Sequence, residues 1–485
     1  MMPAEAESQE RHRRVAVVGA GITGLAAAFR MTRRHGDVQI EIFDTSSRAG
    51  GTIRTEHRDG FLIEHGADAF ITSKPGGLEL CQDLGISDQL IGTDDQHRRS
   101  LVVYRGRPVP IPEGFMLMAP AKPMAILKSP ILSLSGKLRL LSEVVRPRKD
   151  TDEDESLASF VRRRFGTETF ERLVQPLVGG IYTADPEKLS LKATLPRFPA
   201  MEREHGSVIR AALKASGPAE KRERPAESGA RYGLFVTHAK GLSALIESIV
   251  STLESSGRVQ LHLGATVDCI EPSAKVSGRW QIRAGSDDET SFHGVILAAP
   301  SWVAATLLGS VDSQVAAELK AIEYASTVVV ASTHRLSDFR HPLDAFGLVV
   351  PSVENRKILA VSFSSRKFAG RAPHGSVLLR TFVGGATQPE LLRMSDDNIL
   401  KTVVDELGDL LGMTESPLFA SVWRHEQAMP QYHVGHLDRI DRIVQRMSIH
   451  HGLELAGNAY TGIGVPDCIS SGYAAADRLA ESGAF

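Results

Sequence analysis

The stretch that decides the fold is VAVVGAGITGL, which covers residues 15–25. Its first four residues form an unbroken apolar run, as expected of a strand buried on both faces, and its last residues begin a segment with helical spacing of apolar side chains. In the turn between them, Gly19 permits a sharp bend, Gly21 lets the backbone approach a pyrophosphate, and Gly24 allows the helix to pack closely on the strand. The sequence therefore predicts a βα unit whose helix N-terminus binds phosphates.

A second apolar strand is predicted at residues 38–43, and it ends at Asp44. A carboxylate at this distance from the glycines accepts hydrogen bonds from the ribose hydroxyls of a dinucleotide. The alternative is an ordinary glycine turn in a βαβ unit, with Asp44 merely solvated. The matching spacing favours the dinucleotide site.

A second glycine-rich loop follows this acid. Gly50 and Gly51 allow another close backbone approach to the same ligand, and Arg48 and Arg54 can neutralise its phosphates. Because one cradle is enough for two phosphates, the second loop indicates a longer cofactor such as FAD. The alternative is a β-turn that carries two surface arginines.

Composition limits the kind of protein that this chain can be. Its 485 residues suffice for two or three domains, and 42% hydrophobic with 24% charged residues is typical of a soluble globular protein. With 56 basic and 58 acidic residues, the net charge of −2 argues against nucleic acid as a partner. Three widely separated cysteines indicate neither a metal site nor a disulfide framework. No segment has the length and apolarity of a membrane span, so we expect a cytoplasmic protein.

Two segments in the first half of the chain allow more than one interpretation. Residues 114–145 are apolar, broken by prolines and dotted with lysines, so they form either core helices or a peripheral contact with the inner face of a membrane. The four arginines between residues 98 and 107 form either a solvated face or a site for a carboxylated substrate.

Other segments are predicted from local patterns alone. A helix is expected over residues 76–90, and the shift to Gly, Pro and charged residues over 214–231 predicts a loop. The pair Gly179–Gly180 lies in an otherwise helical segment and predicts a turn there. Between residues 301 and 425, short alternating runs predict the antiparallel sheet of a second domain.

The second glycine-rich signal lies near the C-terminus, where residues 453–468 read LELAGNAYTGIGVPDC. The pattern predicts a strand, a glycine-studded turn and a helix with Pro466 in its first turn. The free amides of this helix could stabilise negative charge on a reduced flavin. Cys468 is interpreted as a small buried hydrophobe, and a covalent flavin anchor is the alternative.

These motifs resemble a known family. GAGITGL at 19–25 and the Gly50–Gly51 pair are similar to the GG-type flavoproteins, a superfamily that includes monoamine oxidase and phytoene desaturase. More specifically, four stretches resemble the oxygen-dependent protoporphyrinogen and coproporphyrinogen III oxidases. They are LVGGIYTADPEKLS (177–190), TFVGG (381–385), PQYHVGH (430–436) and GNAYTGIGVPDC (457–468).

The resemblance implies an α/β fold in which an FAD-binding two-dinucleotide-fold domain carries an antiparallel substrate sheet and a helical insertion. The FAD-binding domain would combine residues 14–90, 236–300 and 426–485. Residues 91–235 would form the helical region, with substrate and membrane contacts, and residues 301–425 would form the substrate sheet.

The implied activity is an oxidation in haem biosynthesis. FAD removes six electrons from a porphyrinogen in three cycles, and O2 reoxidises the flavin with H2O2 as product. The substrate is protoporphyrinogen IX or coproporphyrinogen III, and the soluble bacterial members point to the latter. No protein acid or base is expected, because flavin N5 accepts a hydride from an electron-rich carbon. A homodimer and the handover of product to a ferrochelatase are further expectations from the resemblance.

The resemblance also assigns site residues. Substrate contacts correspond to Arg99, Gly180, Val349 and Phe382, with Arg98 as the alternative partner of a propionate. At positions 67 and 68 this chain has Ala and Asp where the family often has proline followed by arginine or asparagine. The FAD contacts correspond to Gly19, Ala20, Gly21, Ile22, Thr23, Gly24, Leu25, Asp44, Thr45, Arg48, Gly51, Gly66, Ala67, Asp68, Ala69, Val267, Asn458, Ile463, Gly464 and Val465.

Two other functions compete with this interpretation. The first is another GG-type oxidase that acts on amines or carotenoids, but Tyr460 is the only tyrosine in the C-terminal turn, and an amine oxidase would need an aromatic cage there. The second is a flavin-free binding protein of the same fold, such as a Rab GDP-dissociation inhibitor. The intact phosphate loops and Asp44 argue against it.

Overall fold

The computed structural model describes residues 13–120, 122–215, 234–274, 276–285 and 289–483. Most of the loop predicted over 214–231 lies outside these residues. No helix in the described part of the chain is long and apolar enough to cross a bilayer.

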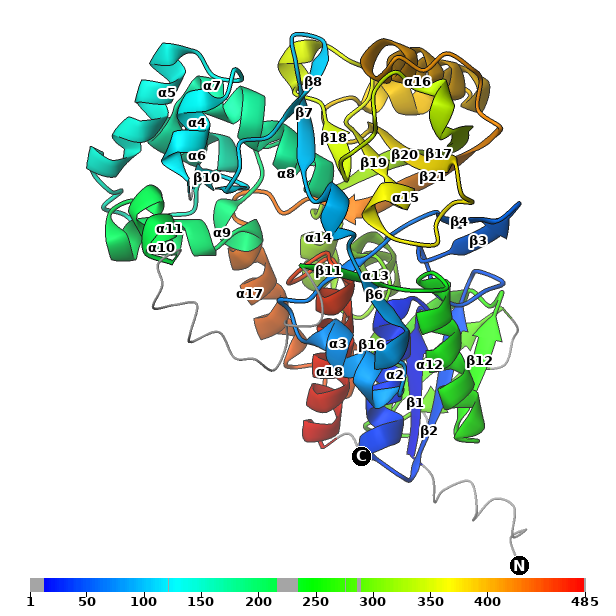
Figure 1. Ribbon diagram of the computed structural model, residues 1–485. Coiled ribbons are helices and arrows are strands. Elements are labelled where there is room, and N and C mark those ends of the chain that lie inside the picture. The colour runs from blue at the N-terminus through cyan, green and yellow to red at the C-terminus, as the bar shows by residue number, and fades with distance from the viewer. Residues whose placement is uncertain (1–12, 121, 216–233, 275, 286–288, 484–485) are drawn as a thin grey trace, which may run out of the picture.

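A five-stranded parallel sheet lies at the base of the molecule (Figure 1). Its strand order is β12–β2–β1–β16–β22, and every neighbouring pair is parallel. The strands are β1 (Arg13–Val18), β2 (Val38–Asp44), β12 (Val259–Leu263), β16 (Gly294–Leu297) and β22 (Leu453–Leu455). Strands β2 and β12 lie on one side of β1, and the later strands β16 and β22 lie on the other side. The carboxyl end of β1 is therefore the switch point at which open α/β sheets bind ligands.

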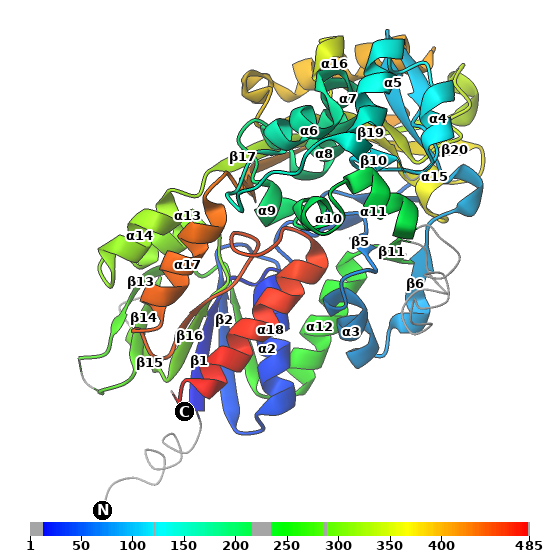
Figure 2. The ribbon, with the colours of Figure 1, turned by 90° about the vertical axis from the view of Figure 1, so that its left-hand side faces the viewer.

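Two layers cover this sheet, as Figure 2 shows. One face packs on helices through the apolar side chains of Val15, Val17 and Ile296, and the other face packs through Ala16, Val18 and Leu297. The helices are α2 (Ile22–Arg34), α3 (Gly76–Asp83), α12 (Ser243–Ser255) and α18 (Val465–Glu481). The opposite layer contains β13 (Val267–Pro272), β14 (Trp280–Ala284), β15 (Glu289–Phe292), α13 (Ser301–Leu307), α14 (Ser313–Lys320) and α17 (His436–Met447).

A seven-stranded sheet lies above the first one, in the order β21–β17–β20–β19–β18–β7–β8. The strands are β7 (Ser100–Tyr104), β8 (Arg107–Pro110), β17 (Tyr324–Arg335), β18 (Gly347–Val349), β19 (Ala360–Phe363), β20 (Ser376–Gly384) and β21 (Phe419–Pro430). The pair β7–β18 is parallel, and the other described pairs are antiparallel. Helix α16 (Asp396–Leu411) covers one face, because alternate apolar side chains of every strand from β17 to β20 pack on it.

Smaller sheets connect the two large ones. Strands β3 (Thr55–Arg58) and β4 (Phe61–Glu64) form a hairpin, and a three-stranded sheet has the order β5–β11–β6. Its members are β5 (Phe70–Ile71), β6 (Leu90–Gly92) and β11 (Phe235–His238). The hairpin contributes Phe61 and Ile63 to a small apolar cluster with Ala331 and Leu378 of the seven-stranded sheet.

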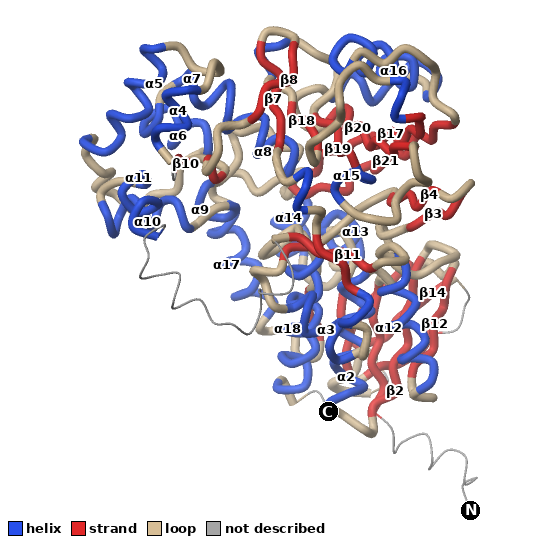
Figure 3. The backbone as a smooth tube through the Cα atoms, in the orientation of Figure 1, coloured by secondary structure: helices blue, strands red, loops and turns tan. Residues whose placement is uncertain are grey.

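A helical region flanks the seven-stranded sheet, and Figure 3 shows its helices gathered to one side of that sheet, with the short strand β10 (Ala119–Pro120) among them. It contains α4 (Pro123–Lys128), α5 (Leu134–Leu141), α6 (Leu157–Phe165), α8 (Gln175–Tyr182), α9 (Leu191–Thr194), α10 (Arg197–His205) and α11 (Val208–Ala215). Its core encloses the fully buried pair Glu143 and Arg164, in which Arg164 Nε donates to Glu143 at 2.8 Å. Glu143 also accepts from the backbone N–H of Val208 at 2.9 Å. Buried charges are tolerated here because both partners are bonded further.

Two local predictions were wrong. The pair Gly179–Gly180 does not interrupt its segment: α8 continues to Tyr182, and the turn comes at Thr183, whose φ is +46°. The helix packs on the sheet here, since a β-carbon on Gly180 would lie 3.7 Å from Val349 Cγ1, an ordinary van der Waals distance. The helix expected over 76–90 ends at Asp83, because Gly85 adopts a positive φ of +70° and a short 3₁₀ turn follows.

The packing of α18 on α2 gives a stability prediction. Gly472 of α18 faces α2, and a β-carbon there would overlap the carbonyl oxygen of Thr23 and lie 3.0 Å from Ala27 N. Helix propensity alone would make Gly472→Ala more stable by about 1 kcal/mol. We expect the opposite sign, a loss of about 1–3 kcal/mol in the free energy of unfolding from overpacking.

Denaturant unfolding of the two glycine variants Gly472→Ala and Gly36→Ala checks this. A β-carbon on Gly36 meets no atom within 4 Å, so this variant is expected to stay close to the parent protein. An increase in stability for Gly472→Ala would contradict the close contact between the two helices.

Candidate functional site

The three glycines of the first turn have different surroundings in the structure. Gly19 has a φ of +110°, and a β-carbon there would overlap Ala298 O; one on Gly24 would overlap Gly19 O. A β-carbon on Gly21 meets nothing within 4 Å. Gly19 and Gly24 are therefore required by the protein's own packing, whereas the space in front of Gly21 is open. Because Gly21 caps α2 without a side-chain bond, the first-turn amides from Ile22 onward have no side-chain cap.

Asp44 is fixed beside this turn. Its carboxylate accepts from Ala20 N at 2.7 Å and from Ser46 N at 2.8 Å, one bond on each oxygen. Each oxygen keeps a lone pair for a further donor, such as a ribose hydroxyl. The segment that leads into β13 is also bonded to Asp44. Ala265 N donates to Asp44 O at 2.9 Å, which brings Val267 to this edge of the sheet.

The second glycine loop lies on the first. Gly50 N donates to Ala20 O at 2.8 Å, and a β-carbon on Gly51 would lie 3.3 Å from Gly21 Cα. Arg48, however, uses its guanidinium on the loop's own carbonyl oxygens, including Ile53 O at 3.0 Å and Gly51 O. It closes the loop in this structure, and phosphate neutralisation by Arg48 stays a prediction. Thr45 is exposed at the rim.

The loop at residues 64–69, which we call the cofactor loop, is held by the seven-stranded sheet. Arg380 donates to Gly66 O, and Asp68 lies 3.2 Å from Lys367 Nζ. Burial alone would raise the pKa of Asp68, but the cations Lys367 and Arg380 hold it below its usual value. Ala67 and Ala69 are half-buried beside it.

The pKa of Glu64, at the start of the cofactor loop, is shifted in the opposite direction to that of Asp68. Burial raises the pKa of its carboxyl to about 7, although it accepts from Leu242 N at 2.7 Å and from Thr55 Oγ1 at 2.8 Å. This carboxyl therefore changes its charge near neutral pH, whereas Asp68 stays ionised.

The C-terminal turn reaches the same edge as the first turn. Ala456 N donates to Leu297 O at 3.0 Å, and a β-carbon on Gly457 would lie 3.8 Å from Ala299 O, beside the backbone that confines Gly19. Gly464 caps α18 with backbone only, and Val465 is buried in the core between α18 and α2. Burial raises the pKa of the Cys468 thiol to about 12, which fits a small buried side chain rather than a reactive anchor.

Tyr432 is a site residue that the sequence analysis did not single out. Its hydroxyl donates to Asn458 O and accepts from Gly462 N at 2.9 Å, so it ties together both sides of the C-terminal turn. The side chain is 2% exposed and stacks on His436 with ring centroids 4.1 Å apart. The available signal was its place in PQYHVGH, one of the four stretches that carry the family resemblance.

These four stretches converge in space. Ser190 N donates to Tyr432 O at 2.7 Å, and Ala386 N, next to the TFVGG stretch, donates to Thr183 O at 2.8 Å. Ile463 of the C-terminal turn packs in the same cluster as Val349. Segments that are far apart in the sequence thus meet between the two large sheets.

Three of the four predicted substrate residues lie together, Val349 and Phe382 on the seven-stranded sheet and Gly180 on helix α8. Phe382 and Val349 both pair with Ala360, from opposite sides, and Gly180 lies over Val349. Arg99 lies apart from them. The residue opposite Val349 is Val102 of β7, so Arg99, which directly precedes β7, lies three residues, about 10 Å, from that row.

The candidate partners of a substrate carboxylate are both paired on the surface. Arg99 is half exposed, forms an ion pair with Asp344 and donates to Asp344 O at 2.9 Å. Arg98 is 55% exposed and lies 3.4 Å from Asp95. Both arginines are exposed and paired with an aspartate, so their surroundings do not show which one would bind a substrate carboxylate. Arg99 as that residue stays a prediction.

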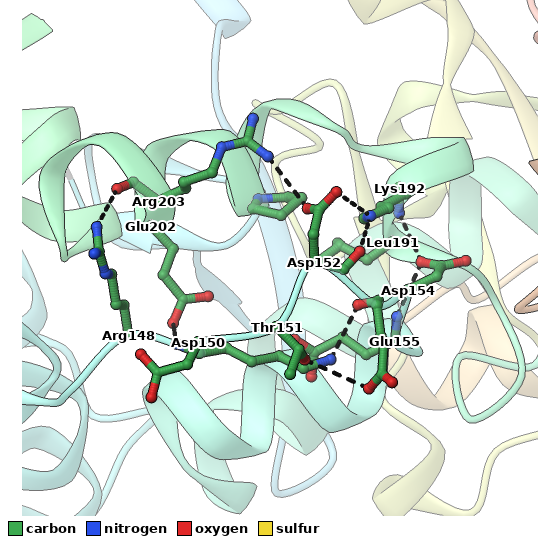
Figure 4. A pocket seen from close by; sticks show the side chains of 13 residues that line it. Arg148, Asp150, Thr151, Asp152, Asp154, Glu155, Leu191, Lys192, Glu202 and Arg203 are labelled. Atoms are coloured by element: carbon green, nitrogen blue, oxygen red, sulfur yellow. Dashed lines mark hydrogen bonds and ion pairs between the residues drawn. The ribbon is translucent and has the colours of Figure 1, made fainter.

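A pocket of about 250 Å³ lies elsewhere, in the helical region (Figure 4). Its walls carry opposite charges that pair with one another: Asp152 lies 3.1 Å from Lys192 and 3.2 Å from Arg203. Glu202 accepts from Lys149 N at 3.2 Å. The pocket contains none of the predicted cofactor or substrate residues, and we do not assign the chemistry to it.

Comparisons with known proteins support a flavin cofactor. The family model described as flavin containing amine oxidoreductase matches residues 22–480. The chain is similar to a coproporphyrinogen III oxidase of Bacillus subtilis (strain 168), with 31% identity that covers 95% of this chain and 96% of that protein. It is also similar to the mitochondrial protoporphyrinogen oxidase of Nicotiana tabacum, with 31% identity over an alignment that covers 99% of this chain and 97% of that protein. Among solved structures, a protein of Exiguobacterium sp. 255-15 provisionally assigned as a protoporphyrinogen oxidase superposes with a TM-score of 0.83 at 27% identity, covering 96% and 98% of the two chains.

Two tyrosines allow a matched test of the C-terminal turn. In Tyr432→Phe, Gly462 N–H loses its acceptor inside the protein, which costs about 1–3 kcal/mol, and we expect the bound flavin to dissociate more readily as the turn loosens. The Tyr473 hydroxyl is buried and has no hydrogen-bond partner in the described residues, so Tyr473→Phe should be neutral. Flavin dissociation, followed by its fluorescence, measures both. Equal flavin affinity in the two variants would contradict the assigned role of Tyr432.

Proposed function

We propose that this chain, which belongs to the flavin containing amine oxidoreductase family, is an FAD-dependent oxidase that converts a porphyrinogen into a porphyrin. The observation that carries this proposal is the meeting of the four family stretches at one place, between the cofactor turns and the row that contains Val349 and Phe382. The named relatives that oxidise porphyrinogens support it along nearly the whole chain.

The residues present fit FAD. Open space in front of Gly21, the uncapped amides of α2 and the free lone pairs of Asp44 suit a pyrophosphate and a ribose. The N-terminus of α18 supplies a second positive end at the same edge. When bound, FAD supplies the acceptor for the hydride that leaves the substrate. We propose that residues 14–90, 236–300 and 426–485 together form this cofactor domain.

The sheet supplies the substrate face. Val349, Ala360, Phe382 and Val329 stand side by side in one register row, which spans about 14 Å because strands lie about 4.8 Å apart. A flat apolar row with one aromatic ring suits a flat macrocycle, and α8 closes over it at Gly180. We propose that Arg99 pairs with a propionate at the rim, where its guanidinium is half exposed.

This row supplies no acid or base. Its members are apolar, so the protein's part is to orient the macrocycle and to exclude water, as expected where the cofactor performs the chemistry. We propose O2 as the electron acceptor. Self-association and product transfer to a ferrochelatase remain expectations from the family.

The helical region carries an exposed apolar patch on α4, α5 and the turn after α5. Met124, Leu134, Leu138 and Val145 are 64%, 74%, 61% and 78% exposed. Four large apolar side chains exposed within one short segment indicate an interaction surface. Lysines at positions 122, 128 and 137 lie in the same segment. We propose that this patch rests in the headgroup region of a membrane.

The function is tested by anaerobic mixing of the flavoprotein with each porphyrinogen. We expect one porphyrinogen to bleach the flavin absorbance within the time of turnover, with release of H2O2 when O2 is admitted. Coproporphyrinogen III and protoporphyrinogen IX are compared at equal concentration, and the faster one identifies the substrate. A primary amine serves as control. Bleaching by the amine and by neither porphyrinogen would overturn the proposal.

The membrane contact is tested with vesicles that contain anionic phosphatidylglycerol. We expect the protein to sediment with these vesicles and Leu134→Ser/Leu138→Ser to lose that binding, because the apolar face no longer inserts. The control is Leu437→Ser/Val444→Ser on α17, which changes two apolar side chains that are also exposed, at 41% and 61%. If both double variants bind as the parent does, the patch does not rest on a membrane.

A further inference from the structure

The substrate face of the seven-stranded sheet carries a second row next to the one that contains Phe382. Strand register places Arg380 between Ala331 on one side and Ser362 on the other, and Ser362 pairs onward with Gly347. These neighbours are small, so the guanidinium of Arg380 is the largest group of its row. In the two rows from β17 to β18, Arg380 is the one position with an ionisable side chain.

Arg380 is 2% exposed, which is unusual for a charged residue. Its Nη2 donates to Gly66 O, and its Nη1 lies 3.5 Å from Asp68 Oδ2. Lys367, from the short helix α15 (Ser364–Lys367), approaches the other side of Asp68 at 3.2 Å. A buried cation of the sheet thus binds both the backbone and the carboxylate of the cofactor loop.

The same guanidinium contacts a substrate residue. Phe382 follows Arg380 by two positions on β20, so both side chains lie on one face, and the guanidinium carbon lies 5.5 Å from the centre of the Phe382 ring. This is the distance of a cation–π contact, which is stronger in a buried place. Arg380 therefore touches the loop that holds the cofactor and the ring that faces the substrate.

We propose that Arg380 is a positioning residue that sets the distance and angle between the flavin and the porphyrinogen, by joining the cofactor loop to Phe382. This inference rests on the proposed function. Arginine suits this role because one guanidinium reaches the Gly66 carbonyl through Nη2, the Asp68 carboxylate through Nη1 and the Phe382 ring. A lysine at position 380 would keep the charge but could not make these three contacts together.

Arg371 provides a matched control. It is also 2% exposed, and it donates to His238 O at 2.9 Å and to Ala239 O at 3.0 Å, all on the side of β11. Among the described hydrogen bonds and ring contacts, its side chain reaches neither the cofactor loop nor Phe382, although its charge acts at longer range on Glu64 and Asp68. Arg371→Met therefore removes a buried guanidinium at a similar cost in stability, without breaking the connection.

The experiment compares Arg380→Met, Arg380→Lys, Lys367→Met and Arg371→Met as purified holoproteins. FAD dissociation is measured by fluorescence, and kcat and KM are measured for the preferred porphyrinogen. We expect Arg380→Met to bind FAD about 10-fold to 100-fold more weakly, the range for a lost hydrogen bond to a charged group. We also expect its KM to rise more than its kcat falls, because Phe382 loses its support.

The other variants separate charge from geometry. Arg380→Lys should resemble Arg380→Met in both measurements, since the fork and not the charge makes the connection. Lys367→Met should weaken FAD binding less and leave KM unchanged, because Lys367 contacts Asp68 but not Phe382. Arg371→Met should lower thermal stability and leave FAD affinity unchanged.

The proposal is overturned if Arg380→Met binds FAD as tightly as Arg371→Met does, or if Arg380→Lys restores both measurements. Should Arg380→Met fail to fold, Arg380→Lys decides in its place by the same criterion. FAD dissociation needs no porphyrinogen, so it tests the connection to the cofactor loop even if neither porphyrinogen reduces the flavin. That last result would instead contradict the proposed function.

Discussion

The site depends on the close contact between the first long helix of the chain and the last one. Gly472 lets α18 lie against the backbone of α2 at Thr23. The strands that lead into the two helices are separated in the sheet by β16 alone. Both glycine turns therefore open at the same edge, and both helix dipoles direct their positive ends toward it. A wider side chain at this contact would separate the two turns, and neither turn alone surrounds a dinucleotide.

Besides the apolar clusters around Phe61 and Ile463, directional contacts join the upper sheet to this base. Trp423 stacks on His65 with ring centroids 3.5 Å apart, His425 hydrogen-bonds His65 O at 2.9 Å, and Arg380 donates to Gly66 O. Apolar contacts tolerate sliding, whereas hydrogen bonds fail over fractions of an ångström. The three contacts all hold one short segment, residues 65 and 66 of the cofactor loop. They thereby fix the position of the seven-stranded sheet relative to this loop.

The sequence predicted the strands, turns and helices that are determined by residues close together along the chain. The strand–glycine–helix pattern at 15–25 and the runs that became β17 to β20 have local periodicity, and the structure contains them. The prediction of a break at Gly179–Gly180 failed, because glycine's low helix propensity is only a weak local preference and α8 continues through the pair to Tyr182. The charge of Arg48 suggested a phosphate partner, and no local pattern indicated that its guanidinium also bonds the carbonyl oxygens of its own loop. Its phosphate contact stays a prediction. Tyr432 and Arg380 act on segments far away in the sequence, and no local pattern indicates such contacts.

The protonation states around the site explain why positioning is the protein's main contribution. Burial raises the pKa of the Tyr432 phenol far above neutrality and lowers that of His436 to about 4, so neither changes charge near pH 7. Asp68 stays ionised beside its two cations. Glu64 is different: its pKa of about 7 in the folded protein exceeds the ordinary 4.5 of an unfolded chain, so its contribution to stability is complete below 4.5 and is lost as the pH rises through 7. When Glu64 ionises at higher pH, its negative charge lies near Arg380 and Arg371, which favour the ionised form against the cost of burial. Among these four groups, Glu64 is thus the one whose charge differs between the two sides of neutrality.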